Sequence, residues 1–478
     1  MNMQIWKNPE EIADKLNRLW EMPARRLKPA AIEGYMRYFE EHCQKSKILA
    51  SEACKYIPGA VQHNLSLNYP FPVCMAKAEG AYMWDVDGNR YTDFLQAGGP
   101  TMIGSNDPYV REKVIEVMNN CGAVTGLFSE YELKLAKLIN RHMPHVEMFR
   151  MLASGTEANM AAIRLARAFT GCTKIIKICA AYHGWSDQLE YDITIAGSHS
   201  ENASGIPKEV YMHTQAVPVN DLDAMREQLE KNRKDGGTAC VIVEPFGPES
   251  GARPVYFDYN RKLRELCNEF GALLIFDEVV TGFRVGLGGA AAFFGVTPDI
   301  TVFGKALTGG YPASGGVGGR REIMQYFSPP EGARYPRVHV GGTLSANPLS
   351  CVGGYYTLLE TEKRQACEKA AAAGDKLCKG IQKIFDRYEL PFVVYNQLSI
   401  IHIDVVGRLN LTITDENREE VKKKLLERNR LLNEFGMALF VEGIVTLVGR
   451  RMYTSLADTD DIIDDVFIRL DRLFKNYC

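Results

Sequence analysis

Short runs of apolar residues recur between about residue 110 and residue 345, separated by segments with helical periodicity. Four runs are dense in Val, Ile, Leu and Phe: 175–181, 239–245, 272–277 and 300–304. A strand with one solvent-facing side would alternate apolar and polar residues, so these runs predict parallel strands that are covered on both faces. Such strands, alternating with helices, are typical of the α/β class.

The two ends of the chain have a different pattern. Residues 1–56 are charged and helix-like, and residues 70–95 indicate short strands with a hairpin turn at Asp87-Gly88. Beyond about residue 346 come charged helices and short strands, ending in a helix that Thr459 could cap. We therefore expect a large α/β domain over 96–345 with a mainly parallel central sheet flanked by helices. Residues 1–95 and 346–478 would form a smaller α+β domain.

Composition narrows the class of protein. The chain has 478 residues, 46% hydrophobic and 24% charged, as in ordinary soluble proteins, and its net charge is −3. That balance argues against a strongly basic nucleic-acid binder or a polybasic membrane-surface protein. The twelve cysteines contain no CxxC pair, and no apolar stretch reaches the ~20 residues of a membrane span. The N-terminal residues carry charges where a signal peptide needs an apolar run, so we expect a cytoplasmic protein. We expect no metal site.

The first candidate for chemistry is the segment ASGTEAN at 153–159. It lies between a strand-like run (148–152) and a helix predicted over 157–169. A small-residue turn at a helix N-terminus offers free backbone N–H groups and two hydroxyls, which suits a phosphate, and Gly155 allows close backbone approach. Ser154 or Thr156 could equally be a simple N-cap.

Further candidates follow the predicted strands. Asp277 and Glu278 end a buried run, where a carboxylate could bind a metal, orient a histidine or hold a cationic ring nitrogen, or could simply be solvated. Lys305 stands in an apolar setting that would favour its neutral, nucleophilic amine, unless its side chain extends to solvent. Tyr182 and His183 follow the 175–181 run, where an aromatic side chain could stack on a flat ring or merely pack at the edge of the core.

A last candidate is the loop GGTLSANP at 341–348, which has hydroxyls and free N–H groups but could be an ordinary turn before a helix. Each of these signals is weak alone, but their order is informative. A phosphate-binding turn, an aromatic residue, a carboxylate and a lysine follow one another, three of them at strand ends. Together they describe a site for pyridoxal 5'-phosphate, with the lysine forming the imine and the carboxylate keeping the pyridine nitrogen protonated.

From about residue 56 onward, the chain resembles the class III (fold type I) pyridoxal-phosphate aminotransferases. It is most similar to the branch of glutamate-1-semialdehyde 2,1-aminomutase and the β-amino-acid aminotransferases. The motifs that carry the resemblance are SGTEANMAAIRLARAFTG (154–171), YHGWSD (182–187), EFGALLIFDEVVTGFRVGLGGA (269–290), GVTPDITVFGKALTGGYPASGGVGGRREIM (295–324) and GGTLSANPL (341–349).

The resemblance implies a role for each matching residue. Lys305 would be the Schiff-base lysine and the base that moves the substrate proton, and Asp277 would pair with the pyridinium nitrogen. The other cofactor-binding positions would be the phosphate-binding Ser154, Gly155 and Thr156, the ring-flanking Tyr182 and Val279, and His183. Thr343 would reach the phosphate of the neighbouring subunit, which implies a homodimer with shared active sites. Residues 196–207 match a mobile lid of the aminomutase branch.

Departures from the family pattern concern the substrate. The arginine that binds the substrate carboxylate in the aminomutases corresponds to Ser66, and that of the β-amino-acid aminotransferases corresponds to His63. Arg450 and Arg451 stand where the aminomutases have a glutamate, and an arginine there could bind a carboxylate from the other side of the pocket. If this segment is a strand, at most one of the two points inward, and both could simply be surface charges.

Two reactions and one other class of protein follow from these observations. The first is an aminotransferase that moves an amino group between an amino acid or amine and a keto acid. The second is an isomerase on the same scaffold, either a glutamate-1-semialdehyde-type 1,2-aminomutase or a racemase or epimerase. The third is a non-catalytic cofactor-binding protein, or a dinucleotide-binding protein using Gly315–Gly319. That glycine run lacks the GxGxxG spacing.

Overall fold

The computed structural model describes residues 2–63, 69–122, 124, 126–199 and 204–478. The chain forms two compact units. Unit 1 comprises the residues up to Pro9 together with 109–364 and 412–414, and unit 2 comprises 10–108, 365–411 and 415–478. Each unit draws on separated stretches of the chain. The domain division into 1–95, 96–345 and 346–478 stays a prediction.

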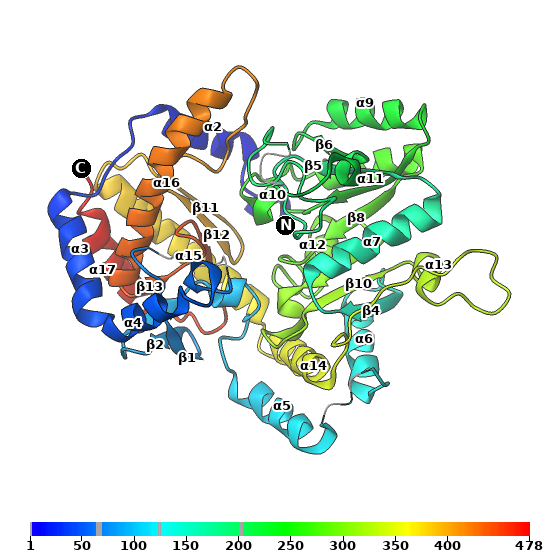
Figure 1. The fold of residues 1–478 in the computed structure, drawn as a ribbon, viewed down its shortest axis with the longest axis horizontal. Coiled ribbons are helices and arrows are strands. Elements are labelled where there is room, and N and C mark those ends of the chain that lie inside the picture. The colour runs from blue at the N-terminus through cyan, green and yellow to red at the C-terminus, as the bar shows by residue number, and fades with distance from the viewer. Residues whose placement is uncertain (1, 64–68, 123, 125, 200–203) are drawn as a thin grey trace. The chain divides into compact units, whose positions relative to one another are not determined.

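A seven-stranded, mainly parallel sheet forms the centre of unit 1 (Figure 1). Its strand order is β4-β10-β9-β8-β7-β5-β6, and the five strands from β5 to β9 are parallel to their neighbours in that group. The bounds are β4 Met148–Leu152, β5 Lys174–Ile178, β6 Thr214–Val217, β7 Thr238–Val243, β8 Leu273–Asp277, β9 Ile300–Gly304 and β10 Gly315–Gly319. All four predicted strands are confirmed. The predicted 175–181 strand is too long, because the chain turns at Ala180, whose φ is +65°.

Helices cover both faces of this sheet. Ile275 in β8 belongs to the apolar cluster under α7 (Gly155–Thr170), whereas its neighbours Leu274 and Phe276 belong to the cluster under α9 (Leu222–Arg233) and α11 (Tyr259–Phe270). Both sets are buried, which explains why the strands read as continuous apolar runs. The remaining helices of unit 1 are α1 Asn2–Ile5, α5 Pro108–Cys121, α6 Glu130–His142, α8 Lys208–Tyr211, α10 Pro248–Gly251, α12 Gly289–Phe294, η3 Lys305–Thr308, α13 Arg321–Met324, η4 Gln325–Phe327 and α14 Pro348–Lys363.

The glycine run Gly315–Gly319 is strand β10, antiparallel to both β9 and β4. A β-carbon at Gly316 would lie 2.6 Å from the Phe149 ring, and one at Gly315 would overlap the backbone of Ser154. The glycines therefore let β10 pack closely against the Phe149 ring and the Ser154 backbone. The run does not form the strand-to-helix turn that dinucleotide binding requires.

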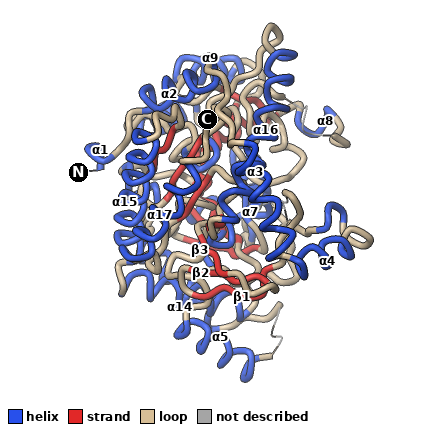
Figure 2. The backbone as a smooth tube through the Cα atoms, turned by 90° about the vertical axis from the view of Figure 1, so that its left-hand side faces the viewer, coloured by secondary structure: helices blue, strands red, loops and turns tan. Residues whose placement is uncertain are grey.

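Unit 2 contains two small sheets. One has the order β1-β2-β3-β13, with its first three strands side by side in Figure 2, and the other has the order β11-β12-β14. The bounds are α2 Pro9–Glu21, α3 Pro29–His42, α4 Gln44–Ala53, η1 Pro58–Ala60, β1 Met75–Glu79, β2 Tyr82–Asp85, β3 Arg90–Asp93, η2 Gln96–Gly98, α15 Ala366–Arg387, β11 Val393–Gln397, β12 Ile400–Asp404, α16 Arg418–Val441, β13 Ile444–Val445, β14 Arg451–Tyr453 and α17 Asp460–Phe474.

Two predictions about local chain signals can be compared with unit 2. The hairpin at Asp87-Gly88 is confirmed: it joins β2 to β3, and the Asp85 carboxylate accepts the N–H groups of Asp87 (3.0 Å) and Asn89 (2.8 Å). The last helix is also confirmed as α17, with Thr459 in the N-cap position. The capping itself is not seen, because the Thr459 side chain makes no cap hydrogen bond. In the described part of the chain, no helix combines the length and apolarity needed to cross a membrane.

Candidate active site

Four site residues predicted from the sequence follow parallel strands of the large sheet. Tyr182 and His183 come shortly after β5, Asp277 is the last residue of β8, and Lys305 follows β9 directly. These strands are parallel, so their carboxyl ends lie at the same edge of the sheet, where α/β proteins bind ligands. The residues predicted from the sequence therefore lie at one edge of the sheet, and their roles stay a prediction.

Asp277 is held by three donors. Its Oδ2 lies 2.7 Å from Nδ1 of His183 and 2.8 Å from Nδ2 of Asn159, and its Oδ1 accepts the Val279 N–H at 3.0 Å. An ionised carboxylate only accepts hydrogen bonds, so His183 carries a proton on Nδ1. All three side chains of the Asp277, His183 and Asn159 cluster are buried. The carboxylate is thus fixed in orientation.

Asn159 was not singled out from the sequence, although it stands within the 153–159 motif. It lies on the buried face of α7, and its Nδ2 also donates to the backbone oxygen of His183 at 3.1 Å. One amide group therefore ties the helix to two site residues. The available signal was a polar residue placed among the buried alanines of an otherwise apolar helix face.

Glu244 is a second residue at this site that was not singled out from the sequence. It follows β7, and its Oε1 accepts the N–H of Tyr182 at 3.0 Å and of Glu249 at 2.9 Å, while Oε2 accepts the N–H of Ser250 at 2.6 Å. Burial raises the pKa of Glu244, and the nearby His183 opposes that rise. An acid at the end of a buried apolar run was the same signal that identified Asp277.

Glycines shape the space beside Asp277. A β-carbon at Gly155 would lie 2.8 Å from Cγ2 of Val279, and one at Gly304 would lie 2.9 Å from Cγ1 of the same side chain. A β-carbon at Gly184 would overlap the Thr156 side chain. Val279 therefore lies between two glycines, and the first turn of α7 packs against Gly184, the residue after His183.

The predicted phosphate turn lies at the start of α7. Ser154 is the N-cap, and its Oγ accepts the Glu157 N–H at 3.2 Å, so the simple capping alternative holds for that hydroxyl. Gly155 and Thr156 form the first helical turn, where backbone N–H groups have no partner within the helix. An anion can bind at such a turn, aided by the positive end of the helix dipole.

Lys305 adopts an uncommon backbone conformation for a lysine, with φ at +44°. It begins η3, is half-buried, and its carbonyl accepts the Ser314 hydroxyl at 3.0 Å. Such a strained position persists only where the surroundings enforce it, and it is frequent at functional sites. Tyr182 keeps 47% of its surface exposed, which leaves its ring accessible.

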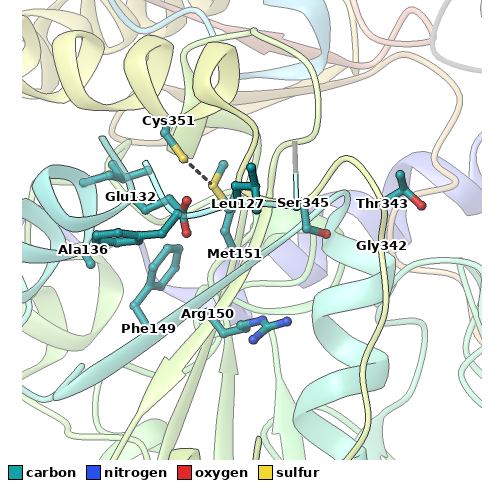
Figure 3. Close-up of a pocket in the computed structure, with 14 residues that line it drawn as sticks. Leu127, Glu132, Ala136, Phe149, Arg150, Met151, Gly342, Thr343, Ser345 and Cys351 are labelled. Carbon is teal, nitrogen blue, oxygen red and sulfur yellow. Dashed lines mark hydrogen bonds between the residues drawn. The ribbon is translucent and has the colours of Figure 1, made fainter. Parts of the chain in front are cut away.

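Thr343 lies in the loop before α14 and is exposed. It lines a cavity of about 460 Å³ with Leu127, Arg150 and Ser345 (Figure 3). Asn347 caps α14 by accepting the Ser350 N–H at 3.0 Å, so the loop is also a turn before a helix, as the alternative interpretation held.

The substrate candidates all belong to unit 2. His63 is exposed, and Arg451 opens β14 opposite His402 of β12, with half-buried Arg450 just before it. Ser66 and residues 200–203 of the predicted lid lie outside the described residues. The roles of His63, Arg450 and Arg451 in substrate binding stay predictions.

Comparison with known proteins identifies the class of this site. The model of the class-III aminotransferase family matches residues 65–446, and the chain belongs to that family. It is 42% identical over 408 residues to glutamate-1-semialdehyde 2,1-aminomutase 2 of Exiguobacterium sp. (strain ATCC BAA-1283 / AT1b), covering 84% of this chain and 90% of that protein.

Two solved structures are also similar over nearly the whole chain. An omega-transaminase from Sphaerobacter thermophilus is 27% identical with a TM-score of 0.80, covering 92% of this chain and 99% of that one. A β-phenylalanine aminotransferase from Variovorax paradoxus is 28% identical with a TM-score of 0.77, covering 96% and 97%. The fold type I architecture predicted from the sequence is confirmed.

Pyridoxal 5'-phosphate is the cofactor of this family, as the sequence predicted. The residues described above fit it. The first turn of α7 suits its phosphate, the Val279 side chain packed between Gly155 and Gly304 suits contact with a flat ring, and the Asp277 carboxylate suits a cationic ring nitrogen. The protein is therefore a pyridoxal-phosphate-dependent enzyme of class III.

Proposed function

We propose that this enzyme transfers an amino group between an amino acid or amine and a keto acid. The observation that carries the proposal is the buried Asp277 carboxylate, held by His183, Asn159 and the Val279 amide at a strand end next to that of Lys305. A fixed anion and an amine at adjacent strand ends are what amino-group chemistry on this cofactor requires.

The bound cofactor supplies an aldehyde that holds the substrate amine and a ring that accepts electrons from the adjacent C–H bond. Asp277 would hold the proton of the ring nitrogen, while His183 and Asn159 keep the carboxylate in place. Lys305 Nζ would hold the resting cofactor and then carry the proton to and from the substrate carbon. Val279 and Tyr182 would flank the ring, and Gly155 and Thr156 would bind the phosphate.

Two features support transfer over isomerisation. Arg450 and Arg451 stand in place of the glutamate of the aminomutases, and the arginine that the aminomutases use for the substrate carboxylate is replaced at position 66. An arginine at 450 or 451 would bind the carboxylate of an acidic donor or acceptor bidentately.

A second candidate function is a 1,2-aminomutase. The 42% identity to a glutamate-1-semialdehyde 2,1-aminomutase favours it, because that likeness is stronger than the likeness to either transaminase. Both reactions begin with the same proton abstraction by Lys305. They differ in whether the amino group leaves the active site on a different carbon skeleton.

The experiment that separates them uses the purified holoenzyme with and without a keto acid. Transamination predicts about one equivalent of keto product per active site from an amino donor alone, and continuous turnover once an acceptor is added. Screening of amine donors and keto acceptors, with chiral analysis of the product, identifies the substrate. Many turnovers to an isomer in the absence of any keto acid would overturn the aminotransferase proposal in favour of the isomerase.

We also propose that the enzyme acts as a homodimer in the cytoplasm. Thr343 is exposed on the same cavity as Leu127, whose side chain is also exposed in the single chain. An exposed apolar surface beside a hydroxyl is suited to burial against a second copy. The mass measured by light scattering, compared between the native chain and Leu127→Asp, tests this arrangement.

A further inference from the structure

One peptide group at the candidate site is held from both sides by buried charges. The carbonyl oxygen of Ala181 accepts a hydrogen bond from Nζ of Lys177 at 2.9 Å, and the N–H of Tyr182 donates to Oε1 of Glu244 at 3.0 Å. These two atoms belong to the same peptide unit. Lys177 lies on β5 opposite Ile242 of β7, so the two charges come from adjacent strands.

Lys177 is fully buried, and its three N–H donors all bind backbone carbonyls. Besides Ala181, they bind the oxygens of Tyr191 at 2.7 Å and Leu189 at 3.3 Å. All three carbonyls lie on the segment 181–191, which contains Tyr182 and His183. The ammonium therefore ties both ends of that segment to the central sheet.

The charges around Lys177 indicate why a cation is present. Burial lowers the pKa of Lys177 to about 8, and the acids Asp192, Glu244 and Glu190 oppose that change. A buried ammonium is costly, and an apolar side chain would avoid the cost. However, three carbonyl oxygens of an irregular segment would then lose this donor, two of them in buried hydrogen bonds, which is also unfavourable.

We propose that Lys177 is a positioning residue for the cofactor site: with Glu244 it clamps the Ala181–Tyr182 peptide and so sets His183 on Asp277. Tyr182 and His183 come directly after that peptide in the chain. Nδ1 of His183 lies 2.7 Å from Oδ2 of Asp277. A rotation of the clamped peptide would move the ring and remove one of the donors that fix the carboxylate. The inference rests on the proposed roles of Tyr182, His183 and Asp277.

The test compares Lys177→Met with Lys174→Met. Lys174 lies on the same strand, but its Nζ binds the exposed Asp235, so its replacement removes a lysine without touching the clamp. Hydrogen exchange of the apoenzyme is followed peptide by peptide, and pyridoxal-phosphate affinity is measured from the absorbance of the bound cofactor. Neither readout depends on which reaction the enzyme catalyses.

We expect Lys177→Met to speed exchange within 181–191 by about tenfold and to weaken cofactor binding by a similar factor, since carbonyls lose their buried partner. Peptides of the central sheet should stay unchanged, and Lys174→Met should behave as the native protein. If Lys177→Met does not fold, Lys177→Gln takes its place, because its amide keeps two donors, and a smaller effect in the same direction is expected.

A double-mutant cycle distinguishes positioning from general stability. If Lys177 acts through His183, then Lys177→Met should weaken cofactor binding by less than about twofold in a His183→Ala background. An equal loss in both backgrounds, or native cofactor affinity in Lys177→Met, would overturn the inference. An enzyme that shows these effects but transfers no amino group would contradict the proposed function and leave the clamp intact.

Discussion

Nδ1 of His183 lies 2.7 Å from Oδ2 of Asp277, with both side chains buried at the end of the central sheet. His183 and Asn159 both donate to Oδ2 of Asp277. Among the described residues, Oδ1 accepts a hydrogen bond only from the backbone N–H of Val279. Two side chains therefore hold Oδ2 in place, while Oδ1 has no side-chain partner in the described part of the chain. In the proposed function, this carboxylate acts through its negative charge.

Replacement of Asp277 by Asn tests the charge. The amide keeps the size of the side chain but cannot stabilise a protonated ring nitrogen, so we expect kcat/KM to fall on the order of 10²–10³-fold. Steady-state kinetics of the holoenzyme measure the loss, with cofactor content determined in parallel. An unchanged rate would mean that another acid supplies the charge.

Replacement of Lys305 by Ala tests the proton-transfer group. We expect turnover to fall by at least about 10³-fold, the range in which a positioned acid–base group acts, and the absorbance of covalently held cofactor to disappear. Far-UV circular dichroism should stay native. Lys174→Ala serves as the control, since that lysine binds a surface aspartate. Retained turnover in Lys305→Ala would contradict the site assignment.

Replacement of Gly155 by Ala tests the packing of Val279. The new methyl group would lie 2.8 Å from Cγ2 of Val279, and overpacking of this kind costs roughly 1–3 kcal/mol. We expect weaker cofactor binding, measured by absorbance titration, and its recovery in the double variant Gly155→Ala, Val279→Ala. Gly34→Ala is the matched control, because a β-carbon there meets nothing within 4 Å. Failure of the double variant to recover would show that Val279 is not the obstacle.

Glu278 gives a pH prediction. Burial raises the pKa of Glu278 from 4.5 to about 7, although the N–H groups of Ala290 and Ala291 and the Thr281 hydroxyl bind it. Between these values the folded protein binds more protons than the unfolded chain, so stability falls as pH rises, by up to about 3 kcal/mol from this residue.

The measurement for Glu278 is denaturant unfolding at several pH values. Between pH 5 and pH 7, we expect Glu278→Gln to lose part of the decline in midpoint that the native protein shows. Glu269→Gln is a suitable control, since Glu269 is an exposed acid paired with Arg226. The same pH dependence in Glu278→Gln and the native protein would contradict the raised pKa.

Arg450 and Arg451 are tested by separate alanine variants. Arg451 is the first residue of β14 and Arg450 lies in the turn before it, so the two side chains leave different local structures. We expect one variant to raise KM for acidic substrates about tenfold with little change in kcat, and the other to stay near native. Amines without a carboxylate provide the control. Two silent variants would contradict a carboxylate-binding role for this pair.

The sequence predicted much of the fold because its strands are buried on both faces. The 272–277 and 300–304 runs are dense in apolar residues, which indicates strands covered on both faces. The Asp87-Gly88 turn could be predicted from the turn preference of these two residues alone. Strand β10 was not predicted. Four of its five residues lack a side chain, so apolar periodicity has nothing to report.

The site was predicted less completely, and for a different reason. Asp277 and Lys305 could be found because they follow recognisable strands and stand in long family motifs. Asn159 and Glu244 carried only a local signal, a polar residue on an apolar helix face and an acid after a buried run, whereas Lys177 is defined by what lies opposite it in space. Lys177 in particular reads as a polar interruption of a strand until its three carbonyl partners are seen.

The glycine strand β10 has a consequence for altering the substrate range of this enzyme. The surrounding atoms leave no room for a β-carbon at Gly315, Gly316, Gly318 or Gly319, so almost any substitution at these four positions would disrupt packing. A library of variants randomised at 315–319 would consist mostly of chains that do not fold. New specificity must instead come from surfaces where side chains can vary, which makes β14 and the loop before α14 the better places to begin.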